Sequence, residues 1–313
     1  MLRFVLGALT YFFALAFVSP VALITGPLAL LLLFQRPTRR ETFIGLLFLA
    51  FTVWSVTGAA DGFDRVADAW VCLLMGGVAV ALGSGAQENR GKLVSGGLMA
   101  VGAAGTAAVL VVLATPFSWH ELYWLATRHY SMLARVAQEV MSQNLSNLPN
   151  GSELLQTMDA TLDWMVEMVS RLLPALVLLQ SVAALAMAWG LYRWFVRQPE
   201  GEPLPRLRDF RFSDQLIWGV VLSLVALVFP GVQSLHLIGG NLAAFFGGLY
   251  VVRGLGIVAS LAGAAGVGGP FVALLASFLT IFLMPVVMIG ALALGVTDTW
   301  VDWRKLALKA KKS

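Results

Sequence analysis

Charged residues are scarce in this sequence. Only 12% of its 313 residues are Asp, Glu, Lys or Arg, whereas 59% are hydrophobic and the mean hydropathy is +0.82. A soluble globular domain carries roughly a quarter charged residues. Too few polar side chains are present to cover a surface in water, which excludes a soluble fold and predicts that lipid surrounds most of the chain.

The sequence also lacks the side chains from which metal and redox sites are built. Cys72 is the only cysteine, which excludes an internal disulfide and a cysteine metal cluster. The histidines are scattered, and His120-Glu121 does not continue into a zinc motif because Trp124 stands where the second histidine belongs. Phosphate-loop and serine-hydrolase motifs are absent as well. We therefore expect no metal, no cofactor, no catalytic residue and no enzymatic activity.

The apolar residues form long runs. A helix needs about 20 of them to cross about 30 Å of hydrocarbon. This criterion predicts an all-α fold, a polytopic transmembrane bundle of about eight to nine spans in a single domain over residues 1–313. The first run, 2–34, is too long for one span, and Pro20 and Pro27 interrupt it, which predicts two short helices turning near Ser19. It has no signal-peptide cleavage site, so we expect it to stay in the mature protein. The other predicted spans are 43–56, 66–82, 93–114, 169–195, 216–229, 237–261 and 271–294.

Basic residues gather in the short loops between these runs. Arg36 to Arg40, Arg90 with Lys92, and the segment 193–211 all fall on one side if the spans alternate, and the positive-inside rule makes that side cytoplasmic. These residues therefore indicate topology rather than nucleic-acid binding. We expect a multi-pass protein of the bacterial cytoplasmic (inner) membrane, with the lipid bilayer as its first partner.

The C-terminal third conflicts with this topology. Three further spans after residue 211 place Arg304 and Lys305 outside, against the positive-inside rule. One segment is therefore miscounted. Three explanations remain open: a re-entrant break in the glycine-rich stretch 263–270, a last helix split by Pro285, or a stretch that lies flat on the membrane.

The polar interval 115–167 is predicted to be an extramembrane, interfacial insertion of amphipathic helices. Its first helix, within 119–143, has an apolar stripe at helical spacing, and 147–151 reads as a turn. A second stripe leads into the next span and consists of Met158, Leu162, Met165 and Val169. The insertion is interpreted either as a helical cap on the outer face or as a solvated linker with an interfacial anchor.

Four polar side chains lie inside the spans, where burial in lipid is costly, and are the candidate ligand-binding residues: Gln180, Asn241, Tyr250 and Arg253. Tyr250 and Arg253 share one helix face, whereas Asn241 points about 180° away from Tyr250. Arg253 either marks the end of its span, holds an anionic ligand or pairs with a carboxylate. Gln180 and Asn241 alternatively bond neighbouring helices. Acidic residues are missing from the central spans, which argues against a proton-coupled carrier.

A cluster of polar and aromatic residues follows the last run and is predicted to be a structural or interface motif: Asp298, Trp300, Asp302, Trp303 and Arg304. If this segment is helical, Asp298 and Asp302 share a face, Asp302 pairs with Lys305, and Trp300 stacks on Arg304. A Trp/Arg belt at the membrane boundary explains the same composition without a ligand.

The residues of the C-terminal third carry a family resemblance. The stretches 240–242, 249–255 and 295–305 resemble the DUF2232, or YybS-like, bacterial membrane proteins, which have a Gly-Leu turn after the penultimate helix. The resemblance implies a fold similar to the S components of energy-coupling-factor vitamin transporters, which capture a small ligand and dock on a separate ATPase. Ala22-x-x-x-Gly26 is the nearest match to their docking motif.

The expected function is therefore to bind or move a small molecule, whose identity the sequence does not reveal. A separate ATPase or another membrane protein is an expected partner, because the chain has no ATP-binding motif. The alternative is a non-catalytic scaffold or assembly protein that binds a protein partner or anionic lipid through the outer helices or the basic segment 193–211.

Overall fold

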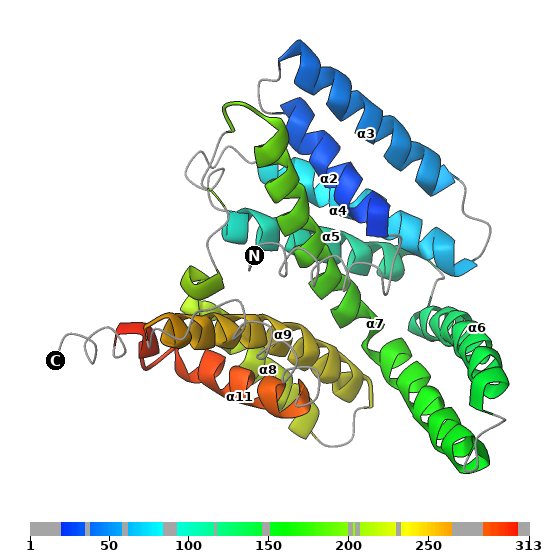
Figure 1. Cartoon of the computed structure of the whole chain (residues 1–313). Helices are drawn as coiled ribbons and strands as arrows, with labels where there is room; N and C mark the ends of the chain where they lie inside the picture. Colours follow the sequence, from blue (N-terminus) through cyan, green and yellow to red (C-terminus); the bar gives the residue numbers. More distant parts are fainter. Residues whose placement is uncertain are drawn as a thin grey trace. The chain divides into compact units, whose positions relative to one another are not determined.

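The regular elements of the described chain are helices, as the all-α prediction requires (Figure 1). The computed structural model describes residues 20–34, 38–57, 62–83, 93–115, 118–145, 151–199, 203, 207–229, 233–264 and 284–305. The chain divides into two compact units, Met1–Glu202 (unit 1) and Pro203–Ser313 (unit 2).

Unit 1 consists of long apolar helices. Its elements are α2 (Pro20–Phe34), α3 (Arg39–Thr57), α4 (Gly62–Gly83), α5 (Leu93–Ala114), α6 (Trp119–Leu145) and α7 (Gly151–Phe195). Within the described ranges, α3, α4, α5 and α7 are long and apolar enough to cross a membrane. Large apolar side chains such as Phe43, Leu47 and Trp54 point outward from α3 and are more than half exposed. Such a surface is unfavourable in water but suits a helix surrounded by lipid.

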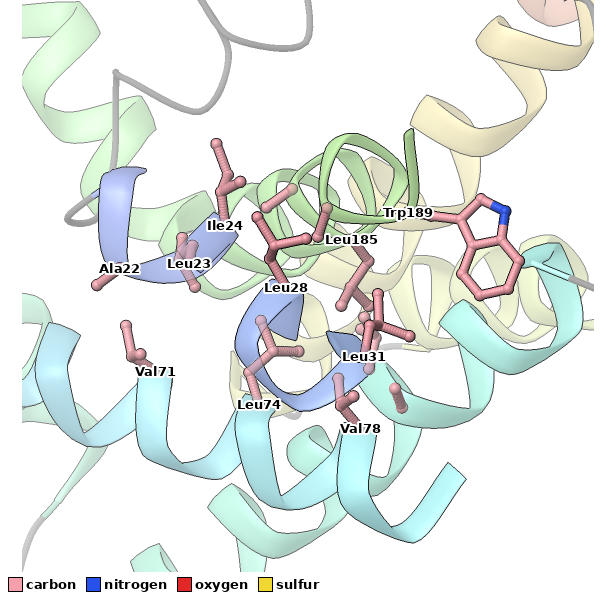
Figure 2. Packing of buried hydrophobic residues seen from close by; sticks show 14 of the residues in the cluster. Ala22, Leu23, Ile24, Leu28, Leu31, Val71, Leu74, Val78, Leu185 and Trp189 are labelled. Atoms are coloured by element: carbon pink, nitrogen blue, oxygen red, sulfur yellow. The ribbon is translucent and has the colours of Figure 1, made fainter. Parts of the chain in front are cut away.

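The core of unit 1 lies between α2, α4 and α7 (Figure 2). Leu28 of α2 and Leu74 of α4 are fully buried there, and Leu185 of α7 joins the same cluster. On another side of α4, Gly77 meets the backbone of α5 so closely that a Cβ would overlap the carbonyl of Ala100. Small residues permit such close approach, which holds helices together where lipid supplies no hydrophobic drive.

The two prolines of the first run have different roles. Pro20 is the first residue of α2, a position that lacks an intrahelical N–H partner in any case. Pro27 lies fully buried inside the same helix. The prediction that Pro27 interrupts the run is therefore wrong. A proline inside a helix removes one backbone hydrogen bond, and packing against neighbouring helices compensates for that loss. The predicted partner helix before Pro20 lies outside the described residues.

Both α3 and α6 begin at a capping box. The Thr38 N–H donates to Glu41 Oε2 at 2.8 Å, and the Glu41 N–H returns a bond to Thr38 Oγ1 at 3.5 Å. Ser118 and Glu121 repeat the arrangement at 2.7 and 3.3 Å. These reciprocal bonds satisfy backbone donors that a helix N-terminus leaves open.

The polar interval forms helices, as predicted. The first amphipathic stretch lies within α6, and the second is continuous with the next span as the 45-residue helix α7. At about 1.5 Å per residue, α7 is roughly twice as long as a bilayer core is thick, so its first half extends beyond one. Figure 1 shows α6 beside that half, and Phe63, Ala126 and Leu173 form a small buried cluster between α4, α6 and α7.

Unit 2 is built around one long helix. Its elements are η1 (Leu207–Asp209), η2 (Asp214–Leu216), α8 (Ile217–Val228), α9 (Gln233–Ala264) and α11 (Met284–Thr297). Figure 1 shows α11 alongside α9, where a Cβ on Gly254 would overlap the carbonyl of Ala291 and one on Gly295 that of Tyr250. The Gly-Leu pair at 254–255, which the resemblance placed in a turn, therefore lies inside α9 and forms a helix contact.

The start of α8 and the end of α11 lie at the same end of unit 2. Arg211, before α8, is paired with Asp302, after α11, at 2.8 Å. The basic residues at 304–305 therefore share a side with Arg208 and Arg211, and the conflict with the positive-inside rule disappears. Pro285 is the second residue of α11 and does not split it. The described part of the glycine-rich stretch, 263–264, belongs to α9, and the rest lies outside the described residues.

Candidate functional site

Three segments of unit 2 converge on the guanidinium of Arg253. Arg253 Nε donates to Asp298 Oδ2 at 3.0 Å, and Nη2 donates to the Asp298 carbonyl at 3.2 Å. Nη1 donates to Asp214 Oδ1 at 2.8 Å. The side chains of Arg253 and Asp298 are only 3% and 1% exposed, whereas that of Asp214 is 64% exposed. The cation therefore has one deeply buried counter-ion and one at the surface.

The helices explain why these charges meet. Arg253 lies roughly 30 Å along α9 from its first residue, at about 1.5 Å per residue, which is the thickness of a bilayer core. α11 ends at Thr297, where carbonyl groups lack intrahelical partners and the helix dipole favours a cation. Asp214 begins the turn that leads into α8, where the dipole favours an anion. Arg253 and Asp214 thus each lie at a helix end of opposite sign, whereas the carboxylate of Asp298 follows the negative end of α11 and depends on Arg253 for compensation.

Aromatic rings cover the guanidinium. Its carbon lies 5.3 Å from the ring centroid of Phe212 and 6.0 Å from that of Tyr250. The two rings meet edge to face, with centroids 5.1 Å apart. A desolvated cation over an aromatic face gains about 2 kcal/mol, and the rings also shield the ion pair from solvent.

A second set of bonds surrounds this centre. Arg304 Nη2 donates to the Phe210 carbonyl at 2.9 Å, and Asp302 accepts from Arg211 and lies 3.2 Å from Lys305 Nζ. Partial burial raises the pKa of Asp302, but hydrogen bonds from Arg211 and Lys305 outweigh it and lower the pKa to about 2. Burial lowers the pKa of Arg304, although the charge of Asp298 opposes that change.

Several buried polar atoms of this cluster lack a hydrogen-bond partner among the described residues. They include Asp298 Oδ1, an acceptor, and Arg304 Nε, a donor. The hydroxyls of Tyr250 and Thr299 are buried near each other without forming a well-aligned bond. Buried polar groups are paired as a rule, so unused donors and acceptors in one place are a departure from ordinary packing and make this cluster the candidate binding site. We call the set Arg253, Asp214, Asp298, Tyr250 and Arg304 the ionic cluster.

The structure brings together only some of the predicted ligand-binding residues. Tyr250 and Arg253 share one buried face of α9, as predicted. Asn241 is half-buried on the same helix and donates to the Leu237 carbonyl at 3.0 Å, away from the ionic cluster. Gln180 is fully buried but belongs to α7 of unit 1.

The C-terminal motif differs in part from its prediction. α11 ends at Thr297 and a turn follows, so Asp298 and Asp302 do not share a helix face. Trp300 is 70% exposed while Arg304 points inward, and the predicted stacking of the two does not occur. The pairing of Asp302 with Lys305 is confirmed. Trp303 anchors the turn, because its Nε1 donates to Thr297 Oγ1 at 3.1 Å.

Sequence reasoning missed the segment that precedes α8. Phe210, Arg211, Phe212 and Asp214 all contribute to the site. The first two were counted only as part of the basic segment 193–211, and the other two were given no role. The available signal was a carboxylate directly before an apolar run. An arginine at the end of a span needs a counter-ion at the same depth, and acidic residues that flank neighbouring spans are the natural candidates.

Apolar helices with lipid-type surfaces and an ionic cluster at the end of a span define a polytopic α-helical membrane protein. The family model described as "Predicted membrane protein (DUF2232)" matches residues 2–299, and the chain belongs to this family. No curated protein and no solved structure matches the chain significantly. Among the described residues, no group of three His, Cys, Asp or Glu side chains is arranged to hold a metal ion.

Proposed function

We propose that this membrane protein is transporter-like and binds a small molecule carrying an anionic group at the ionic cluster of unit 2. The observation that supports this most is the unequal pairing of Arg253. Asp298 is 1% exposed and holds the guanidinium from within, whereas Asp214 is 64% exposed at the open side. Asp214 therefore occupies the place in which an arriving carboxylate or phosphate would accept from the Nη1 donor of Arg253.

Exchange of the two anions costs little. An ion pair with a well-exposed partner contributes about 0–1 kcal/mol, so releasing Asp214 into water is nearly neutral. Asp298 keeps the buried cation neutralised during the exchange, which avoids the large penalty of an unpaired buried charge. The unused Arg304 Nε and the hydroxyls of Tyr250 and Thr299 offer additional bonds to the polar part of the molecule.

The surroundings of the site fit a cytoplasmic opening in a bacterial inner membrane. Arg208, Arg211 and Lys305 lie at the same end of unit 2 as Asp214, and the positive-inside rule assigns such an end to the cytoplasm. Movement of the molecule across the membrane would draw its energy from a separate ATPase, as in S-component systems, or from an ion gradient. Binding is the part of this proposal that the ionic cluster supports directly.

The test is a ligand screen on the purified full-length chain in detergent, with a panel of small carboxylates and phosphates and thermal unfolding as readout. Asp214→Asn removes the competing carboxylate, and we expect the apparent affinity for a stabilising anion to rise about fivefold, the equivalent of ~1 kcal/mol.

The matched control is Asp209→Asn, an equally exposed aspartate of η1 outside the cluster, which leaves the affinity unchanged. Arg253→Lys keeps the charge but loses the fork, and binding should disappear. An unchanged or weaker affinity in Asp214→Asn contradicts the proposal.

The scaffold alternative is favoured by a different observation. The apolar stripe of α6 continues past its buried part as Leu133, Val136 and Val140, all more than half exposed, in a helix that does not qualify as a span. A protein partner or the membrane interface would cover such a stripe. Co-purification with Val136→Glu as the variant distinguishes the two: loss of a stoichiometric protein partner supports the scaffold, and an unchanged composition with anion binding intact supports the small-molecule function.

A further inference from the structure

A buried carboxyl lies inside a candidate span of unit 1. α4 begins at Gly62, which puts Asp68 in the second turn of a helix long and apolar enough to cross a bilayer. Asp68 is only 8% exposed. The expectation that acidic residues are missing from the spans is therefore wrong for α4, because Asp68 lies inside both the predicted span 66–82 and the observed helix.

The Asp68 carboxyl has no cationic partner among the described residues. Its Oδ2 is buried and accepts no hydrogen bond there. Arg65 on the same helix is exposed, and Asp64, one turn earlier, adds a like charge. Burying an ionised carboxylate without a partner costs many kcal/mol, so such a group neutralises by keeping its proton. The neutral acid is the form that this environment favours.

One hydrogen bond between polar side chains joins α4 to α7 near the level of Asp68. Trp70 Nε1 donates to Ser181 Oγ at 2.9 Å, which aligns that part of α4 with the middle of α7. Asp68 precedes Trp70 by two residues and therefore lies near the same level of α4, but at about 100° per residue its side chain points to nearly the opposite side of the helix. The cluster between α2, α4 and α7 is apolar, as Figure 2 shows for Val71, Leu74 and Leu185.

Few other titratable groups are near enough to influence the carboxyl. The helices packed against α4 include α2, α5 and α6. The described residues of α2 and of α5 include no Asp, Glu, Lys, Arg or His. On α6, His129 stacks on Phe63 and Tyr130 meets the same ring, about one and a half turns from Asp68. Glu41 of α3 is held by Thr38. None of these supplies a fixed positive charge at the carboxyl.

We propose that Asp68 is a proton-binding site of unit 1, a neutral acid at rest that releases its proton when water reaches the carboxyl. Intramembrane carboxyls of this kind bind and release protons in carriers and pumps because hydration alone changes their charge. The site is separate from the ionic cluster, and its test does not depend on the proposed anion binding. If Asp68 binds protons and the ionic cluster binds an anion, Asp68 is the group through which a proton gradient acts on this protein.

The test is infrared spectroscopy of the full chain in lipid, comparing the wild type with Asp68→Asn. We expect a carboxylic C=O stretching band at neutral pH that is lost in Asp68→Asn and retained in Asp64→Asn, the exposed control on the same helix. The band should decline only at alkaline pH. Carboxylate bands at neutral pH in the difference between wild type and Asp68→Asn would show an ionised group and overturn the proposal.

Carbodiimide labelling of the wild type provides a second measurement that needs no variant to fold. The acid adds across the reagent without a leaving group: its oxygen bonds to the central carbon and its proton moves to a nitrogen, so only the protonated form reacts. Mass spectrometry of the peptides should find one reagent added at Asp68 and none at Asp64 near neutral pH, with the label disappearing as pH rises. Absence of label from Asp68 at neutral pH, or equal labelling of Asp64, contradicts the proposal.

Discussion

The interior of unit 1 and the ionic cluster of unit 2 hold helices together by different means. Between α2, α4 and α7 the contacts are almost entirely apolar, and α4 meets α5 at the Cα of Gly77. At the end of unit 2 an arginine joins the start of α8, the middle of α9 and the end of α11 through two carboxylates. Both regions nevertheless use glycine contacts, since α9 meets α11 at Gly254 and Gly295.

The difference shows where each kind of contact is effective. In lipid, apolar surfaces gain nothing by leaving the solvent, so helices associate through close packing, and small residues at contact points are decisive. At a boundary with water, charges can pair with less desolvation, and a cation can satisfy the last carbonyls of a helix at the same time. The apolar interior therefore sets how closely helices approach, and the ionic cluster sets which helix ends meet.

The strongest test of this comparison removes the buried counter-ion. Asp298→Ala leaves Arg253 buried with half of its charge compensation gone, and we expect the free energy of unfolding to fall by about 3–5 kcal/mol. Asp214→Ala should cost under about 1 kcal/mol, because Asp214 is largely exposed. Thermal unfolding of both variants in detergent measures the contrast. Equal losses in the two variants would mean that burial does not distinguish the two carboxylates.

A methyl group at the helix contact tests the apolar interior. Gly77→Ala places a Cβ against the Ala100 carbonyl, and we expect a loss of about 1–3 kcal/mol from overpacking. The adjacent Gly76 faces open space, so Gly76→Ala is the matched control and should be neutral or slightly stabilising. Unfolding curves for the pair decide the matter, and identical stabilities would contradict close packing at Gly77.

The bond between Trp70 and Ser181 tests whether a polar contact contributes inside the apolar interior. Trp70→Phe and Ser181→Ala should each cost about 1 kcal/mol, and the double variant should cost less than their sum because both remove the same bond. A double-mutant cycle on unfolding free energies measures this coupling. If the two losses in unfolding free energy simply add, the 2.9 Å hydrogen bond contributes nothing to stability.

The smallest effect concerns acid pH at the ionic end. The pKa of Asp302 is lowered to about 2 from the model-compound value of 3.8, so its pairing stabilises the fold fully above about pH 4. That contribution is lost as the pH falls from about 4 to 2, where the carboxylate takes up a proton in the folded state too. In Asp302→Asn, the free energy of unfolding, measured as a function of pH, should fall less between about pH 4 and 2. Its dependence on pH near neutrality should be unchanged. A profile identical to that of the wild type would exclude Asp302 as its source.

Much of the architecture could be predicted from the sequence. Low charge and long apolar runs determine that the chain is helical and surrounded by lipid, because backbone amides in hydrocarbon must be satisfied within their own helix. Helical spacing predicted the amphipathic helix of 119–143 and the shared face of Tyr250 and Arg253. The starts of α3 and α6 could also have been predicted, from the capping-box sequences Thr38-x-x-Glu41 and Ser118-x-x-Glu121. Hydropathy and composition alone do not reveal these boxes.

Other features could not be read from residue order. Hydropathy placed the start of α4 at residue 66 rather than 62, because the charged residues Asp64 and Arg65 lower the local average although they belong to the helix. α11 ends at Thr297, and the Asp298 carbonyl just beyond it accepts from Arg253 on another helix. The partners of that arginine lie 39 and 45 positions away in the chain.

The sequence by itself therefore determined that lipid surrounds this protein, that its fold is helical, and which residues are too polar for lipid. Only the tertiary structure decided which of those residues meet, that Arg253 is neutralised by Asp298 and Asp214, and that Asp68 is left without a counter-ion among the described residues. The physical reason is that transfer into hydrocarbon is a property of each segment, whereas the cost of a buried charge is decided by its neighbours, and these come from distant parts of the chain.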